Sequence, residues 1–302
     1  MIKYLVYILT FVMIISSCRK DLHSSVFDKS ADQRLNTVLT DYQSILVAAP
    51  YGWVANVVPA LETNEKIYSF WFKFNDSNRV VSRWKAEPPL TSSYRLKALQ
   101  RPELIFDTYT YLHLLADAEK KVPGAAAGTG LKSDFELEII SAAADSFVFK
   151  GRYNGADVTF QKATAGDTAG NVRVLGHYPL AGSYQATAVR ILYATTAADS
   201  LVGSIGNFKG IKEFSPSKYA DTVVVDYGDL GNSNWRYRIA LTADGQGITV
   251  TPNATMESQI KPGSFKILAQ SYDRGSGRIY LKSFYTNSAG ADRVTEETFI
   301  RR

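Results

Sequence analysis

The sequence is poor in the residue types that build reactive and metal-binding centres. Among 302 residues there are one cysteine and three histidines, at positions 23, 113 and 177. A single cysteine excludes an intrachain disulfide, and three scattered histidines offer little for a metal cluster or a catalytic triad. The His-Glu-x-x-His and Gly-x-Ser-x-Gly patterns of common hydrolases are also missing. We therefore expect a non-enzymatic protein without metal or cofactor.

Dense runs of one charge are missing as well. The net charge of +5 is spread along the chain, and no cluster of Lys and Arg stands out. Proteins that bind nucleic acid usually gather their basic residues into a patch. The pattern therefore argues against a nucleic-acid partner and indicates an ordinary, slightly basic surface.

The chain has one long apolar run, at its very start. Lys3 precedes an apolar core over residues 5–15, and Ser16-Ser17 lead directly into Cys18. The run is short for a membrane span and has the order of parts of a secretory signal. Because small residues directly precede the lone cysteine, the segment resembles a bacterial lipobox, which implies a signal peptide over residues 1–17 and a lipid anchor on Cys18. The alternatives are an uncleaved anchor or an ordinary signal with an incidental cysteine.

The rest of the chain predicts a tether and two domains. Residues 18–27 are polar and form the tether, and the remaining length exceeds that of a usual single domain. The small, polar segment 164–171 is the expected boundary. It separates an N-terminal domain over residues 28–165 from an all-β domain over residues 172–302.

In the first domain, the pattern changes from helical to strand-like. Apolar residues spaced by three and four predict a helix from near Ser30 to just before Pro50. Strands are expected over residues 53–58, 67–74 and 80–84, with Trp71 facing outward. Asn154-Gly155 predicts a tight two-residue hairpin turn that closes the domain.

The second domain shows closely spaced strands with no intervening helix. They are expected at residues 183–193, 203–208, 222–227, 235–241, 247–251, 265–272, 278–285 and 293–300. Such spacing is typical of a sandwich or barrel. The expected fold class is therefore mainly β (α+β): an N-terminal helix packed on an antiparallel sheet, followed by a β-sandwich-like or barrel-like domain.

Several motifs of the first domain suggest a family. They are the helix leading into Tyr51-Gly52-Trp53, Ser93-Tyr94-Arg95-Leu96, Phe106-Asp107-Thr108-Tyr109, His113, the glycine-rich loop 124–130 and Asp134-Phe135-Glu136-Leu137. Over about residues 30–165 the chain resembles an uncharacterised family of Bacteroidetes-type lipoproteins, known only as a domain of unknown function and often associated with outer-membrane nutrient uptake. The resemblance implies no catalytic residues. Residues 234–239 and 295–301 are loosely similar to terminal domains of surface glycan-binding lipoproteins.

Aromatic side chains are the candidate ligand contacts. Exposed Trp and Tyr rings stack on sugars while their polar tips form hydrogen bonds, which makes Trp71, Trp84, Trp235 and Tyr237 the residues to test. The alternative for each is a place in the core. Asp107 and His113 are further ligand candidates, although Asp107 also suits a helix cap and a lone histidine suits a structural role.

Two groups of oxygen-bearing residues leave other functions open. Glu136 and Glu138 share one face of a strand, as the carboxylate pair of a glycosidase requires. Asp226, Asp229, Asn232 and Asn234 form an oxygen-rich loop that suits either calcium or solvent. Asp167-Thr168-Ala169, Asp199-Ser200-Leu201 and Asp221-Thr222-Val223 resemble short O-glycosylation motifs.

The function expected from these residues is that of an outer-membrane lipoprotein on the periplasmic or cell-surface face. It would capture a glycan or peptide for a neighbouring outer-membrane transporter complex. The alternatives are a structural or assembly subunit that docks another envelope protein, and a carboxylate-dependent glycoside hydrolase.

Overall fold

The structure is a computed structural model of the whole chain. It describes residues 28–61, 65–99, 101–119, 121–122, 125–169, 172–193, 201–227 and 235–302. The predicted signal peptide, Cys18 and the tether lie outside the described residues. Two units are distinguished, Met1–Val38 and Leu39–Arg302. The second holds two antiparallel sheets, which confirms the expected mainly β class.

The predicted N-terminal helix is present as α2, Ala31–Val47. It begins with a capping box in which Ser30 Oγ accepts from the Gln33 amide at 3.2 Å and Gln33 Oε1 accepts from the Ser30 amide at 3.1 Å. The helix ends three residues before Pro50, which cannot continue it. In the described part of the chain, no helix is long and apolar enough to span a membrane.

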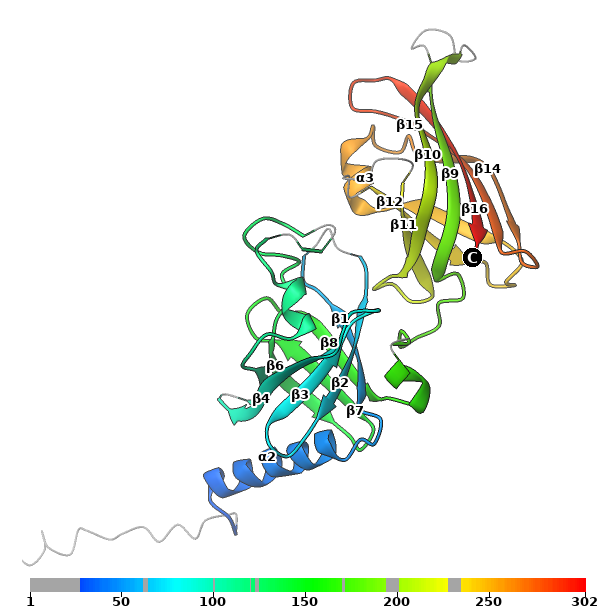
Figure 1. The fold of residues 1–302 in the computed structure, drawn as a ribbon. Helices are drawn as coiled ribbons and strands as arrows, with labels where there is room; N and C mark the ends of the chain where they lie inside the picture. The colour runs from blue at the N-terminus through cyan, green and yellow to red at the C-terminus, as the bar shows by residue number, and fades with distance from the viewer. Residues whose placement is uncertain are drawn as a thin grey trace, which may run out of the picture. The chain divides into compact units, whose positions relative to one another are not determined.

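The first sheet is a closed eight-stranded barrel in which every strand pairs with the next and β1 pairs with β8 (Figure 1). Its strands are β1 (Trp53–Val58), β2 (Tyr68–Phe74), β3 (Arg79–Arg83), β4 (Leu90–Ala98), β5 (Pro102–Phe106), β6 (Glu136–Ala142), β7 (Ser146–Gly151) and β8 (Asp157–Lys162). Alternating side chains point inward along each strand. Closure leaves no unpaired sheet edge.

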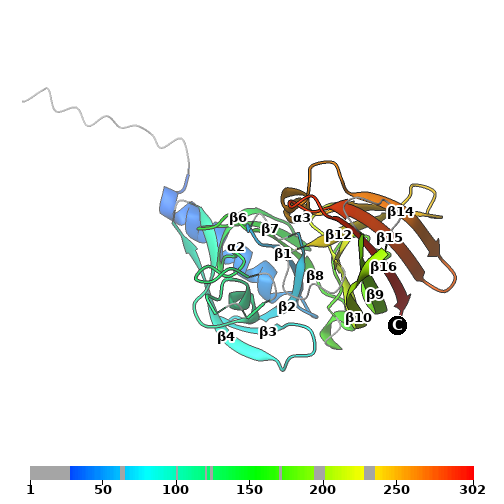
Figure 2. The same ribbon diagram turned by 90° about the horizontal axis from the view of Figure 1, so that it is seen from above.

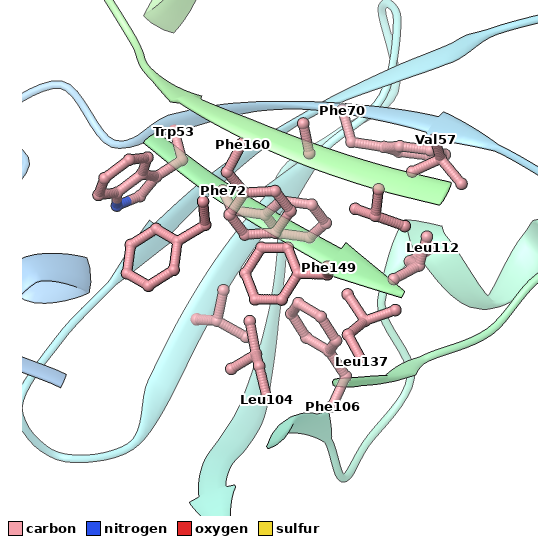
Figure 3. Close-up of a cluster of buried hydrophobic side chains, with 14 of the residues drawn as sticks. Trp53, Val57, Phe70, Phe72, Leu104, Phe106, Leu112, Leu137, Phe149 and Phe160 are labelled. Carbon is pink, nitrogen blue, oxygen red and sulfur yellow. The ribbon is translucent and has the colours of Figure 1, made fainter. Parts of the chain in front are cut away.

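The interior of this barrel is filled with aromatic side chains (Figure 3). Phe72 stacks on Phe160 with centroids 5.6 Å apart, and Trp53 meets Phe147 edge-on at 5.3 Å. The last turn of α2 closes over this core, because Leu46 is fully buried in it and its carbonyl accepts from Trp53 Nε1 at 2.8 Å. The barrel is therefore a packed core.

The connection between β7 and β8 is longer than the predicted two-residue turn. The last strand pair is Lys150 with Asp157, the Gly151 amide still donates to the Ala156 carbonyl at 2.8 Å, and residues 152–155 form the loop. The reason is the buried carboxylate of Asp134, which accepts from the backbone amides of Tyr153, Asn154 and Ala156 at 2.9, 2.8 and 3.1 Å. The prediction of a tight Asn-Gly turn was wrong because the Asp134 side chain, about twenty residues earlier in the sequence, accepts the hydrogen bonds of these amides.

The second sheet has eight strands in the order β13-β12-β11-β10-β9-β16-β15-β14 and is strongly curved (Figure 2). Its strands are β9 (Gly182–Tyr193), β10 (Leu201–Pro216), β11 (Thr222–Asp226), β12 (Arg236–Leu241), β13 (Ile248–Pro252), β14 (Lys266–Asp273), β15 (Arg278–Thr286) and β16 (Asp292–Arg301). The edge strands approach each other, since Gln270 Nε2 donates to the Ile248 carbonyl at 3.0 Å. The expected barrel-like arrangement is confirmed.

One short helix of this half was not expected. The helix α3, Ala254–Gln259, follows β13 and lies beside β12 in both ribbon views (Figures 1 and 2). Asn253 caps it, because its side-chain oxygen accepts from the Met256 amide at 3.1 Å. Met256 is buried in the core of the sheet, so the helix is fixed in place.

Candidate functional site

The main candidate is an open hollow of about 650 Å³ at one end of the second sheet. This volume lies within the range of small-molecule sites in proteins. The hollow is lined by residues from three segments: Trp235, Ser258, Gln259, Tyr285, Asn287, Ser288 and Arg293. We refer to it below as the Trp235 hollow.

Trp235 is held in a fixed orientation from three sides. Its ring meets Tyr285 edge-on at 5.4 Å and Tyr227 at 6.0 Å. Its indole nitrogen donates to Gln259 Oε1 at 2.8 Å, and its backbone carbonyl accepts from the Tyr227 amide at 3.0 Å. Because the side chain is only partly buried, the ring presents a preorganised apolar surface to the hollow.

The β15–β16 hairpin supplies the opposite wall. Tyr285 and Arg293 are direct cross-strand partners, so their side chains lie on the same face of the sheet. The turn between them is fixed by Asn287, whose backbone amide and side-chain oxygen both bond to Ala291, at 2.9 and 2.8 Å. Gly290 takes a positive φ of 82° in this turn. These backbone and side-chain hydrogen bonds fix the conformation of this wall.

The polar groups of the hollow are mostly neutral. Ser258, Ser288, Asn287 and Gln259 bring hydroxyls and amides, and Arg293 brings the one formal charge among the described lining residues. An aromatic surface ringed by hydroxyls, amides and a guanidinium can bind a polar molecule that has a flat apolar face. Saccharides have this combination of surfaces.

Tyr237, predicted beside Trp235 as a ligand contact, lies elsewhere. Its side chain is fully buried, its hydroxyl pairs with Ser283 Oγ at 2.7 Å, and burial raises its pKa well above the ordinary value. Tyr237 belongs to the hydrophobic core of that half, whereas Trp235 packs against the edge of this core. Its ring, as placed, has no surface left for a ligand.

The two candidate tryptophans of the barrel, Trp71 and Trp84, are also engaged by neighbouring residues. Trp71 points away from the barrel interior, as expected, but is buried in a small cluster with Val54 and Ala163, and its indole nitrogen donates to the Tyr51 carbonyl at 2.7 Å. Trp84 packs on Phe70 at 6.0 Å, and the ammonium of Lys85 lies 4.7 Å from its ring centre. Trp71 is therefore closed to a stacked sugar, and the ring of Trp84 is already in contact with Phe70 and Lys85.

Asp107 and His113 lie near each other in sequence but have separate structural contacts. Asp107 pairs with Arg95 at 3.0 Å and does not cap the following helix, η1 (Tyr111–Leu115), whose N-cap is Thr110. His113 Nδ1 accepts from the Thr110 amide at 3.1 Å, and its ring stacks on Phe135 at 4.3 Å. Burial lowers the pKa of His113 to about 4, so the ring is neutral at pH 7.

The carboxylates singled out in the sequence do not line the Trp235 hollow. Glu136 and Glu138 flank the inward-facing Leu137 and so point out of the barrel, where Glu136 accepts from the Tyr153 hydroxyl at 3.4 Å. Asp226 pairs with Arg236 at 3.0 Å, while Asp229, Asn232 and Asn234 lie outside the described residues. Among the described residues, no group of three or more His, Cys, Asp or Glu side chains is placed to hold a metal ion.

A second hollow, of about 460 Å³, opens between the edge strands β13 and β14. Its lining is largely apolar and consists of Val250, Thr251, Pro252, Glu257, Ile260, Pro262, Gly263, Phe265, Lys266 and Ile267. It lacks an exposed indole and side-chain amides. It therefore suits a saccharide less well than the Trp235 hollow.

Sequence reasoning found Trp235 but missed the residues around it. Gln259 and Ser258 depend on α3, which Asn253 signals as a helix N-cap directly after a strand. Tyr285 and Arg293 follow from the turn at residues 287–290, which makes them hairpin partners. Both residues lie some fifty positions from Trp235 in the sequence, and no local sequence pattern predicts that they contact the same hollow.

The comparisons with known proteins name no function. No curated protein matches the sequence. A crystal structure of a protein of unknown function from Bacteroides ovatus is similar at 12% identity and a TM-score of 0.27, covering 83% of this chain and 79% of that one. The family model described as a domain of unknown function, DUF4302, matches residues 23–191. This match spans more than half of the chain, which therefore belongs to the DUF4302 family.

Proposed function

We propose that this protein is a lipid-anchored envelope protein that binds a saccharide in the Trp235 hollow and supplies it to a nutrient-uptake system. The choice of a saccharide is supported by the partly exposed indole of Trp235, which Tyr285 and Gln259 hold in place next to the amides and hydroxyls of the hollow. A ring that is already immobilised loses little conformational freedom when a ligand binds. The site therefore suits reversible capture.

Capture rather than reaction is supported by the composition of the site. The described lining residues of the Trp235 hollow include no Asp, Glu, His or Cys that would serve as acid, base or nucleophile. The paired carboxylates that a glycosidase uses are likewise missing from this set. A binding role requires only the contacts that the hollow provides.

Binding is tested with a panel of oligosaccharides and short peptides on the purified full-length protein in detergent. Trp235→Ala should abolish saccharide binding, and Trp235→Phe should retain part of it, because a smaller ring keeps some stacking surface. Tyr153→Ala is the matched control, since that tyrosine is 72% exposed and belongs to the first barrel. Saccharide binding that survives Trp235→Ala, or binding of peptides alone, would refute the saccharide site.

The membrane anchor rests on the sequence. Lys3, the apolar run over residues 5–15 and the small residues before Cys18 support lipid attachment at that cysteine. Cells grown with labelled palmitate should yield labelled protein, and Cys18→Ala should lose both the label and the envelope fraction. An unlabelled wild type, or an envelope-bound Cys18→Ala variant, would contradict the anchor without affecting the saccharide test.

A further inference from the structure

The Trp235 hollow has a single charged group in the described part of its wall, and that group is cationic. Arg293 lies in the hollow together with four neutral polar residues, Ser258, Gln259, Asn287 and Ser288. A ligand without charge would leave the guanidinium beside its binding surface with no matching anion. The electrostatics of the site therefore favour a ligand that carries a negative charge.

Arg293 is positioned by the backbone rather than by a carboxylate. Its Nη1 donates to the Asp292 carbonyl at 2.8 Å, and no ion pair joins it to an acidic side chain among the described residues. The neighbouring Asp292 carboxylate accepts from Thr286 Oγ1 at 2.8 Å. The remaining N–H donors of the guanidinium are thus available to an acceptor brought by a ligand.

Strand pairing places Arg293 next to one of the aromatic residues of the hollow. Arg293 is the direct cross-strand partner of Tyr285, whose ring meets that of Trp235 at 5.4 Å. A sugar ring stacked on Trp235 would therefore share the hollow with the guanidinium. A planar guanidinium binds a carboxylate through two parallel hydrogen bonds, which gives orientation as well as affinity.

We infer that the saccharide bound in the Trp235 hollow is acidic, and that Arg293 recognises the carboxylate of a hexuronic acid unit. This inference rests on the proposed saccharide site and specifies its ligand class. Trp235 supplies the stacking surface, and the Gln259 amide nitrogen, which has no hydrogen-bond partner among the described residues, donates to a hydroxyl of the same ring. Arg293 then acts as the residue that determines specificity.

The test compares acidic oligosaccharides with their carboxyl-reduced counterparts by calorimetry on the full-length protein in detergent. The probes are oligomers of galacturonate, glucuronate and mannuronate, the same chains after reduction to neutral sugars, and a sulfated galactan. Wild type should bind at least one uronate oligomer about 10- to 100-fold more tightly than its reduced form. Added salt should weaken the former and leave the latter unchanged.

Variants separate the inference from the function on which it rests. Arg293→Gln should lower the affinity for the uronate chain until it no longer exceeds that for the reduced chain, and Arg293→Lys should keep only part of the preference because Lys lacks the planar fork. Arg278→Gln is the control, because Arg278 lies at the opposite end of β15, the strand that pairs with the strand of Arg293, β16. Equal binding of acidic and reduced chains, a preference for the sulfated chain, or an unchanged preference in Arg293→Gln would overturn the inference alone. Failure of every saccharide to bind would overturn the proposed function.

Discussion

The carboxylate of Asp134 lies beneath the loop that carries Asn154, and its Oδ1 accepts from the Asn154 amide at 2.8 Å. The same carboxylate also accepts from the amides of Tyr153 and Ala156, and Asn154 Nδ2 returns a bond to the Ser133 carbonyl at 2.9 Å. Asp134 is almost fully buried, so its charge is balanced by these donors and not by water. This one side chain therefore determines how β7 is joined to β8.

Replacing Asp134 should destabilise the barrel strongly. Asp134→Ala leaves three amides without their acceptor, and we expect a loss of about 2–4 kcal/mol in the free energy of unfolding, measured with urea. Asp157→Ala is the control from the same hairpin. It removes only an exposed pair with Lys150 and should cost less than about 1 kcal/mol. Equal losses in the two variants would contradict the role assigned to Asp134.

Gly52, in the Tyr51-Gly52-Trp53 motif, should tolerate no side chain. It has a φ of 79°, and a Cβ atom there would lie 2.3 Å from the Phe72 carbonyl oxygen. Gly52→Ala thus combines left-handed strain with a backbone clash, and we expect a loss of more than about 3 kcal/mol in urea unfolding. Gly128 has a φ of 83° with open space around it, so Gly128→Ala carries the strain alone, about 1–2 kcal/mol. A Gly52→Ala variant no less stable than Gly128→Ala would rule out the clash.

The strands could be predicted because their signals are local. All eight strands of the second sheet were expected within a few residues, except that β10 extends to Pro216, well beyond its predicted end at residue 208. Closure of the first sheet could not be predicted, since the pairing of β1 with β8 joins segments a hundred residues apart. The strand β4 was missed because polar residues such as Arg95 and Lys97 interrupt its apolar pattern, and β5 because it is only five residues long and begins with proline.

The candidate site was predictable only in part. Trp235 and Tyr237 point to the same face of one strand, and sequence alone cannot say which of the two lies at the open end of the sheet. The structure distinguishes the two residues by their burial, since Tyr237 is fully buried while Trp235 lines the hollow. Arg293 joins the site through strand pairing and ring packing, which are properties of the fold.

A buried ion pair crosses the second sheet and should behave differently when one or both partners are replaced. Lys212 Nζ lies 3.0 Å from Glu297 Oε1, and both side chains are buried. Lys212→Met leaves a buried carboxylate without its cation, at an expected cost of about 3–5 kcal/mol. The double variant Lys212→Met with Glu297→Leu should recover most of that loss, because both charges of the pair are then removed from the interior.

The matched control for this pair is Lys282→Met. Lys282 pairs with Glu296 at 2.7 Å, but both side chains are about one-third exposed. The expected loss in urea unfolding is therefore below about 1 kcal/mol. If the double variant were as unstable as Lys212→Met alone, the loss would come from packing and not from the uncompensated charge.

The stability of the barrel should fall in acid because of His113. Burial lowers the pKa of this imidazole from its ordinary 6.5 to about 4. Between these values the unfolded chain binds a proton that the folded chain does not, so stability is lost as the pH falls through this window. From pH 7 to pH 5 we expect a fall of about 1 kcal/mol in the free energy of unfolding, reduced from the full value because the ring is partly exposed. His113→Phe keeps the ring stack on Phe135 and should remove this fall, whereas His177→Gln, at an exposed histidine, should retain it. An unchanged pH dependence in His113→Phe would show that other groups cause the loss.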